Sequence, residues 1–252
     1  MTLLAALLIA AAGFAAGAVN AVAGGGSLIS FPALLAVGYP SVTANVTNTV
    51  ALFPGYAGSV AGARQELDGQ RLRVRALGVT SVVGGVAGAA VLLTTPGEVF
   101  QEIVPFLILL ACLLLAVQPW LAALVRRLPG ADKEHRSALL HFAALFAAAY
   151  GAYFGAGLGV MLLALLGIFL GDQLKRINAL KNVLSLVINA VALVAFAAFG
   201  PVEWPAVAVV ALSSLLGGYL GARLARRIGA RVLRTLVVVY GLVVAGILFV
   251  QS

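Results

Sequence analysis

Apolar stretches separated by short polar ones follow one another along the whole chain. The first charged residue is Arg64, and long uncharged stretches follow at Ala76–Gly97, Ile103–Val125, Asn182–Val202 and Thr235–Ser252. Each has about the 20 residues that a helix needs to cross the hydrocarbon core of a bilayer. Apolar residues run continuously through these stretches, whereas the strands of a membrane barrel alternate apolar and polar positions. The pattern therefore predicts an all-α, polytopic integral membrane protein.

Two stretches interrupt this pattern with glycines and resemble each other. The first has Gly24–Gly26 and then an apolar run to Gly38, and the second has Gly157, Gly159 and a run to Gly171. Later in each half, a serine, three glycines and an alanine recur with one spacing, at Ser81–Ala89 and Ser214–Ala222. Many transporters consist of two repeats, each with a broken hydrophobic segment. We therefore expect one transmembrane repeat at 1–127, a cytoplasmic linker at 128–137, and a second repeat at 138–252.

Composition and charge narrow the class of protein. Hydrophobic residues make up 63% of the chain and charged residues 10%, which leaves no room for a separate soluble domain. The net charge of +8 could indicate nucleic-acid binding, but the basic residues lie in short clusters between apolar stretches. Such clusters are typical of the cytoplasmic loops of membrane proteins. They are Arg64–Arg75, Arg126–Arg136, Lys175–Lys181 and Arg223–Arg234.

The positions of these clusters predict a topology. Eight full crossings would put at least one basic cluster outside, against the positive-inside rule. The conflict disappears if 3–37 and 138–170 each enter the membrane, turn at their glycines and return to the same side. Six helices then cross fully, at roughly 41–63, 76–95, 99–125, 177–199, 204–222 and 232–250. All basic clusters become cytoplasmic, and the two repeats have opposite orientations in the membrane. A full crossing by the roughly 20-residue leg before each turn stays open.

The glycine breaks are the first candidate site. Backbone groups exposed at membrane depth must be buried in protein or line a watery cavity. A half-helix that begins at the break directs its free N–H groups toward that space, which favours an anion. The candidate residues are Gly24, Gly25, Gly26, Ser27, Gly157 and Gly159, with half-helices beginning near Ser27 and Val160. For the later glycines, Gly84, Gly88, Gly217 and Gly221, we favour close helix packing.

Polar residues inside the apolar spans are the second candidate set. Helical spacing puts Asn45, Asn48 and Thr49 on one face of a helix. The equivalent helix of the second half carries Asn178, Lys181, Asn182 and Ser185 on one face. Such amides can bind an oxyanion or hydrogen-bond other helices, and both interpretations stay open. A lysine in the membrane either extends to the surface or faces a polar cavity, and we favour an anion contact for Lys181.

Other chemistry has little support in the sequence. The motifs of zinc proteases, α/β-hydrolases and P-loop proteins do not occur. Two histidines and one cysteine make a transition-metal site improbable, so we expect no cofactor and no enzyme activity. A membrane-embedded enzyme or scaffold is therefore a weaker hypothesis than a transporter or a passive channel. The expected partners are a small anionic substrate and the lipid bilayer, without nucleic acid, and a homodimer is left open.

The segments Ala23–Pro32, Ala44–Ala51 and Asn178–Ser185 resemble the sulfite exporter TauE/SafE family of membrane transporters. The resemblance extends over nearly the whole chain. It implies a multi-pass protein of the cell (inner) membrane that exports a small sulfur-containing anion, of the sulfite or organosulfonate class. Transport would proceed by alternating access at the interface of the two repeats. A passive anion channel and a transporter of another small organic anion are the alternatives, and the coupling ion is open.

Overall fold

The computed structural model describes residues 2–22, 25–127, 133–228 and 230–251, and these contain helices and no strand. The helices are α1 (Leu3–Val22), α2 (Ser27–Ala36), α3 (Ser41–Gly62), α4 (Arg71–Thr94), α5 (Gly97–Arg127), α6 (Lys133–Tyr153), α7 (Leu158–Leu170), α8 (Leu174–Phe199), α9 (Trp204–Ile228) and α10 (Ala230–Gln251), with a 3-10 turn η1 (Gln65–Leu67). The predicted all-α class is confirmed. We expected the basic cluster Arg223–Arg234 to form a loop, and this expectation is wrong, because α9 and α10 extend into it. Arginine is a good helix former, so a basic cluster need not end a helix.

Four of the described helices are long and apolar enough to cross a membrane, over Leu3–Asn20, Arg71–Thr94, Gly97–Trp120 and Leu174–Phe199. Large apolar side chains cover their outer faces, such as Val79 on α4 and Phe106 on α5. The chain is therefore a multi-pass membrane protein. α3 is not among the four, although we expected 41–63 to cross. Its first half is buried among other helices, so this half can carry amides and hydroxyls that a lipid-facing helix could not.

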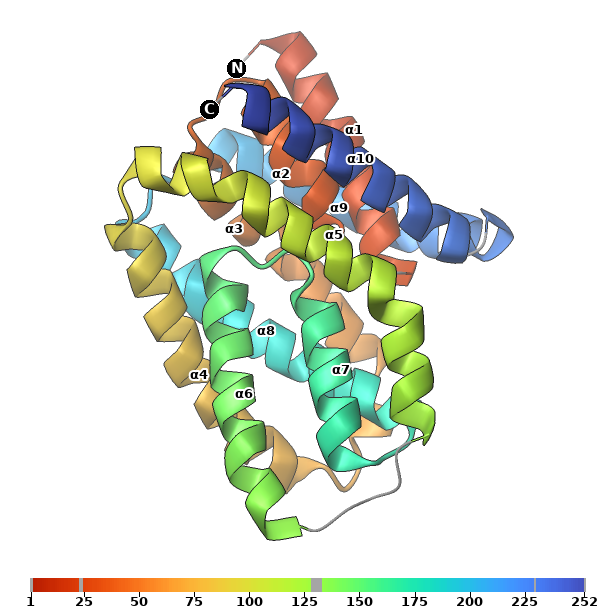
Figure 1. The fold of residues 1–252 in the computed structure, drawn as a ribbon. Coiled ribbons are helices and arrows are strands. Elements are labelled where there is room, and N and C mark those ends of the chain that lie inside the picture. The colour runs from red at the N-terminus through yellow and green to blue at the C-terminus, as the bar shows by residue number, and fades with distance from the viewer. Residues whose placement is uncertain (1, 23–24, 128–132, 229, 252) are drawn as a thin grey trace.

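Two helical hairpins organise the interior (Figure 1). α6 runs from one end of the molecule to its middle, where the chain turns, and α7 returns to the same end. α1 and α2 form the corresponding hairpin from the opposite end. Glycines make both turns, because Gly25, Gly155 and Gly157 have φ of 87°, 78° and 80°. Side chains other than glycine rarely adopt this left-handed conformation.

The two halves of the chain pack in an equivalent way. α1 and α4 of the first half correspond to α6 and α9 of the second, and α1 lies along α9 as α6 lies along α4. A Cβ atom on Gly88 would lie 2.0 Å from the carbonyl oxygen of Ala149, and one on Gly217 would lie 1.9 Å from that of Phe14. The prediction of close packing is thus confirmed for these two glycines and for Gly84. The surroundings of Gly221 lie outside the described part.

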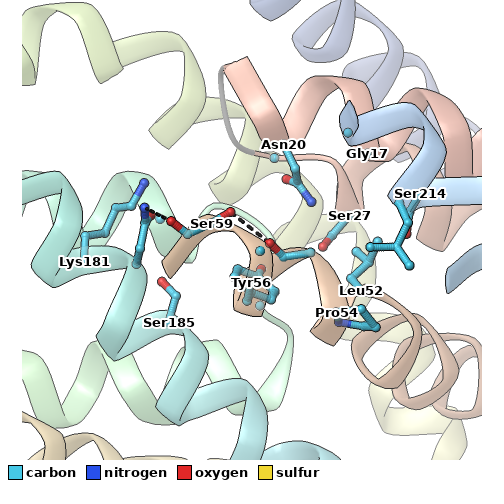
Figure 2. A pocket seen from close by; sticks show the side chains of 18 of the residues that line it. Gly17, Asn20, Ser27, Leu52, Pro54, Tyr56, Ser59, Lys181, Ser185 and Ser214 are labelled. Carbon is cyan, nitrogen blue, oxygen red and sulfur yellow. Dashed lines mark hydrogen bonds between the residues drawn. The ribbon is translucent and has the colours of Figure 1, made fainter. Parts of the chain in front are cut away.

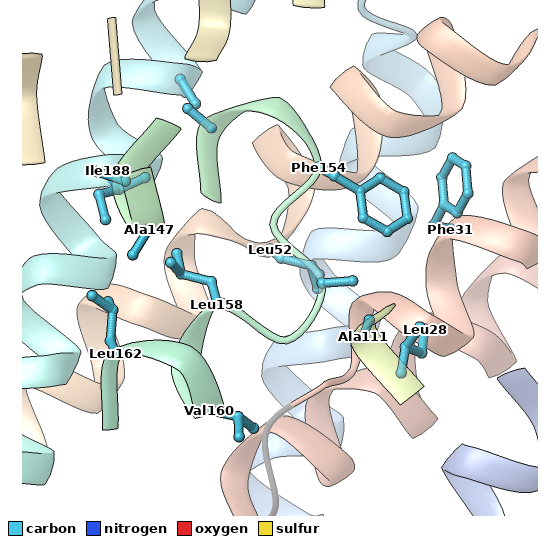
Figure 3. Close-up of a cluster of buried hydrophobic side chains, with 14 of the residues drawn as sticks. Leu28, Phe31, Leu52, Ala111, Ala147, Phe154, Leu158, Val160, Leu162 and Ile188 are labelled. Atoms are coloured by element: carbon cyan, nitrogen blue, oxygen red, sulfur yellow. The ribbon is translucent and has the colours of Figure 1, made fainter. Parts of the chain in front are cut away.

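A continuous apolar core connects the two hairpins (Figure 3). Phe31 of α2 meets Phe154, in the turn after α6, with ring centroids 5.4 Å apart in an edge-to-face arrangement. Leu52 of α3 and Leu158 at the start of α7 are buried beside them. Edge-to-face pairs add about 0.5–1.5 kcal/mol to the effect of burial. The two turns are therefore held close together in the middle of the fold.

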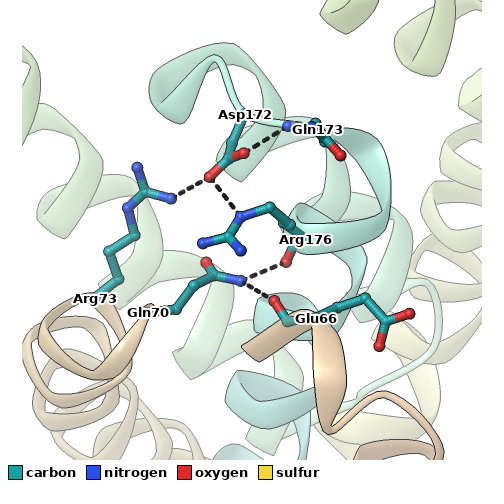
Figure 4. Close-up of polar contacts among 6 residues, drawn as sticks. All are labelled: Glu66, Gln70, Arg73, Asp172, Gln173 and Arg176. Carbon is teal, nitrogen blue, oxygen red and sulfur yellow. Dashed lines mark hydrogen bonds and ion pairs between the residues drawn. The ribbon is translucent and has the colours of Figure 1, made fainter. Parts of the chain in front are cut away.

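A polar cluster joins the two halves at one end of the molecule (Figure 4). Asp172, between α7 and α8, accepts hydrogen bonds from Arg73 of α4, from Arg176 of α8 and from the Gln173 N–H. Gln70 donates to the carbonyl oxygens of Glu66 and Arg176, at 2.9 and 3.0 Å. Burial opposes ionisation of Asp172, but these hydrogen bonds outweigh it and hold the pKa of its carboxyl below the ordinary value.

Candidate functional site

A pocket of about 440 Å³ lies between the two glycine turns (Figure 2). Gly25 and Ser27 line it from the first hairpin, and Gly155, Gly157 and Gly159 line it from the second. Residues of α1, α3, α8 and α9 complete the wall. Elements far apart in the sequence therefore meet at one cavity, which is where broken membrane helices often bind a ligand.

The predicted site residues divide into two groups. Those that line the pocket are Gly25, Ser27, Gly157, Gly159, Lys181 and Asn182. Those that do not are Gly26, Asn45, Asn48, Thr49 and Asn178. Gly24 lies outside the described residues. The lysine, one amide and both glycine breaks thus come together, whereas the polar face of α3 turns elsewhere.

Lys181 is the only charged residue among the described lining residues. Its side chain comes from the second turn of α8 and is half-buried. The Lys181 Nζ lies 3.9 Å from where a Cβ on Gly159 would stand, so the ammonium faces the start of α7. No hydrogen bond or ion pair holds this ammonium within the part of the chain that the structure describes. A cation without a counter-charge at such a depth favours a negatively charged ligand.

The backbone donors at the two turns differ. At the start of α7, Leu158 donates to Gly155, and Val160 and Met161 both donate to Gly157. The N–H of Gly159 has no acceptor among the described residues, and the start of a helix attracts an anion. At the start of α2, the equivalent N–H of Gly26 donates to Asn20 Oδ1 at 2.8 Å. An amide oxygen of the protein thus occupies the first turn, and the second turn is open.

Ser185 adds a hydroxyl beside Lys181. It lies one helical turn further along α8, is 2% exposed and lines the pocket. Its Oγ has no hydrogen-bond partner in the structure described. A buried hydroxyl usually has a partner, so this one is a free donor for a ligand. Lys181, Ser185 and the start of α7 together form a site that suits one anionic group.

The asparagines of α3 make hydrogen bonds within the protein. Asn45 Nδ2 donates to the carbonyl oxygen of Tyr153 at 2.8 Å, and Asn48 Oδ1 accepts from Ser30. Thr49 Oγ1 donates to the Asn45 carbonyl oxygen at 3.0 Å. These bonds tie α3 to both hairpins and leave the pocket to other residues. Asn178, the counterpart of Asn45, is exposed near the start of α8.

Sequence reasoning missed several lining residues, among them Asn20, Tyr56, Ser59, Gly155 and Ser214. Asn20 had a readable signal, because it is the one amide in the apolar run before the first glycine break. Ser59 and Tyr56 had no such signal in the sequence, because they line the pocket only as a result of how α3 packs against α8. Asn182 Nδ2 donates to the Ser59 carbonyl oxygen at 3.5 Å, which marks this contact.

The fold and the pocket define a class: a multi-pass helical membrane protein with broken helices around a central, cationic cavity. Comparison with known families makes this specific. Residues 9–248 match the model of the sulfite exporter TauE/SafE family, and the chain belongs to that family. It is thus a membrane transporter by family, as the resemblance in the sequence implied.

Several relatives are described only as probable membrane transporter proteins. One is ORF9 of a Sinorhizobium species, 28% identical over 96% of this chain and 91% of its own length. A second, from Haemophilus influenzae, is 27% identical over 90% of this chain and 88% of its own. A third, YfcA of Escherichia coli K12, is 26% identical over 94% and 87%. No solved structure matches the chain.

Proposed function

We propose that this protein exports a small sulfur-containing anion, of the sulfite or organosulfonate class, through the cell (inner) membrane. The observation that carries the proposal is the Lys181 ammonium, which has no partner among the described residues and lines a pocket whose described lining has no carboxylate. An unpaired charge in a half-buried position is unfavourable, and a bound anion would neutralise it. The name of the family supports the sulfur chemistry.

We further propose that the two halves are inverted repeats that alternate access to this pocket. The equivalent packing of α1 on α9 and of α6 on α4 supports a two-fold relation. The hairpins that enter from opposite ends support the inversion (Figure 1). Transporters of this design move one repeat against the other around a fixed central site.

The pocket lies toward the end of the molecule that carries the Arg64–Arg75 cluster. We assign this end to the cytoplasm. In α3, Ser41–Leu52 is nearly all buried, whereas Gly55–Gly62 is largely exposed and borders the pocket. At the opposite end Thr47 Oγ1 accepts a hydrogen bond from the Glu203 N–H at 3.1 Å, which joins α3 to the segment between α8 and α9. This arrangement supports an inward-facing conformation, ready to load a cytoplasmic anion.

Reconstitution tests the proposal. Purified protein in liposomes should take up labelled sulfite or a labelled alkanesulfonate with saturation and with counterflow against the same anion. Lys181→Gln should weaken substrate binding by at least about tenfold, because hydrogen bonds to charged groups contribute about 1.5–3 kcal/mol. The matched control is Lys175→Gln, at an exposed position on the same helix, which should behave as wild type. Unchanged affinity in Lys181→Gln would exclude this site, and an unsaturable conductance would favour the channel.

A further inference from the structure

The pocket has two ends that differ in chemistry (Figure 2). Lys181 and Ser185 lie at one end of the view, and Leu52 and Ser214 lie at the other. The anion end comprises Gly159, Lys181 and Ser185, and the distal lobe comprises Gly17, Leu52, Ser214, Leu215 and Gly218. The distal lobe therefore belongs mainly to α1, α3 and α9, on the side away from the lysine.

The pocket is larger than one inorganic anion requires. Its volume of about 440 Å³ falls in the range of about 300–1,000 Å³ that is typical of pockets for organic molecules. Leu52 and Leu215 give the distal lobe an apolar wall. Ser214 offers no free donor, because its hydroxyl donates to the carbonyl oxygen of Ala211 at 3.0 Å. The lobe thus suits an uncharged group.

The two halves differ at the wall of the distal lobe. α1 and α9 touch through their backbones, since a Cβ on Gly17 would lie 2.0 Å from the Ser214 carbonyl oxygen. At the same place before the second glycine break stands Tyr150, whose hydroxyl donates to the Ala156 carbonyl oxygen at 2.6 Å. A tyrosine side chain therefore stands at the one position, whereas the backbone of α9 takes the place of a side chain at the other.

The distribution of charge limits the ligand to one negative group. The distal lobe has no cation among its described residues. The N–H of Gly26, which could have met a second anionic group near the first turn, already donates to Asn20. A second negative charge would be buried without a partner, which is strongly unfavourable.

We propose that Leu52 and Leu215 select the uncharged part of a monovalent organic anion whose charged group lies against Lys181. The inference rests on the proposed function and deepens it. It assigns the ligand one charged end and one apolar end, excludes anions with a second charged group, and names the residues that set the length of the apolar part.

Calorimetric titration of the purified full-length protein tests the inference with methanesulfonate, ethanesulfonate, 1-butanesulfonate and the divalent 1,2-ethanedisulfonate. The Kd should fall about fourfold with each added methylene group, as expected for burial of apolar surface. Ethanedisulfonate should bind at least about tenfold more weakly than ethanesulfonate, because its second charge has no partner. Equal affinities along the series, or tighter binding of the divalent anion, would overturn the inference.

Two neighbouring positions on α9 provide a matched pair of variants. Leu215 and Leu216 are 46% and 58% exposed, so either can become tryptophan without a large change in the core, and only Leu215 lines the pocket. Leu215→Trp should lose the gain in affinity from longer chains, whereas Leu216→Trp should keep it. The same behaviour in both variants would refute the role of the distal lobe.

Lys181→Gln separates this inference from the proposed function. If Lys181→Gln weakens methanesulfonate binding while chain length has no effect in wild type, the anion end stands and the distal lobe assignment is wrong. If Lys181→Gln binds every anion like wild type, the anion end is wrong, and this inference is refuted with it.

Discussion

Gly88 on α4 offers a direct test of how closely the helices pack. A Cβ there would lie 2.0 Å from the carbonyl oxygen of Ala149 on α6, and 2.8 Å from the Cα of that residue. Both neighbours are backbone atoms, so the helices themselves must separate when Gly88 becomes alanine. Such overpacking typically costs about 1–3 kcal/mol. Alanine also raises helix propensity by about 0.8–1.0 kcal/mol, which partly offsets this cost.

Gly78→Ala is the matched control, because Gly78 is on the same helix and a Cβ there meets nothing within 4 Å. Both variants gain the same helix propensity, so the difference between them isolates the clash at about 1–3 kcal/mol. Thermal unfolding of the protein in detergent should show Gly88→Ala melting roughly 2–12 °C below Gly78→Ala. The packing argument is refuted if Gly88→Ala melts at or above the control.

Two further predictions concern stability. Asp172→Asn should lower stability at neutral pH: the folded-state pKa of Asp172 is depressed, so its contribution is present above the unfolded pKa and lost as the pH falls through the folded one. Melting curves against pH should converge with wild type in acid, and a constant gap would contradict the reasoning. Asn45→Ala should cost about 1–3 kcal/mol, because the partly buried carbonyl of Tyr153 loses its donor. The control is Asn178→Ala, at the exposed counterpart position, whose free energy of unfolding should stay within about 0.5 kcal/mol of wild type. Equal losses of stability in the two variants would argue against the role of the Asn45 hydrogen bond.

The helices and their breaks could be predicted because glycine and hydropathy act locally. α2 begins at Ser27 as expected, and α7 begins at Leu158, close to the expected Val160. The extension of α9 through Arg223 could not be predicted from charge, because a cluster of arginines predicts the side of the membrane and not the end of a helix. Inversion of the repeats and re-entry of the hairpins stay predictions.

The site was predictable in part, for a physical reason. Lys181 stood out because an ionisable residue in a membrane segment is costly and needs a polar environment. Asn45 and Asn48 stood out for the same kind of reason, but their side chains form hydrogen bonds with Tyr153 and Ser30 and do not line the pocket. Helical spacing shows which residues share a face, but not which helix lies opposite. Their partners are far away in the sequence or across a turn, so only the fold reveals them.

The Asn20 amide that occupies the first turn has a consequence for the transport cycle. Two identical halves would give a carrier the same energy profile in both directions. Here one turn carries its own acceptor, while the other must find one in the ligand. If the protein alternates access as proposed, its inward- and outward-facing conformations should bind the anion with different strengths, so half-saturation should occur at different concentrations on the two faces of the membrane. Divergence after duplication would in this way have made a symmetric architecture kinetically one-sided.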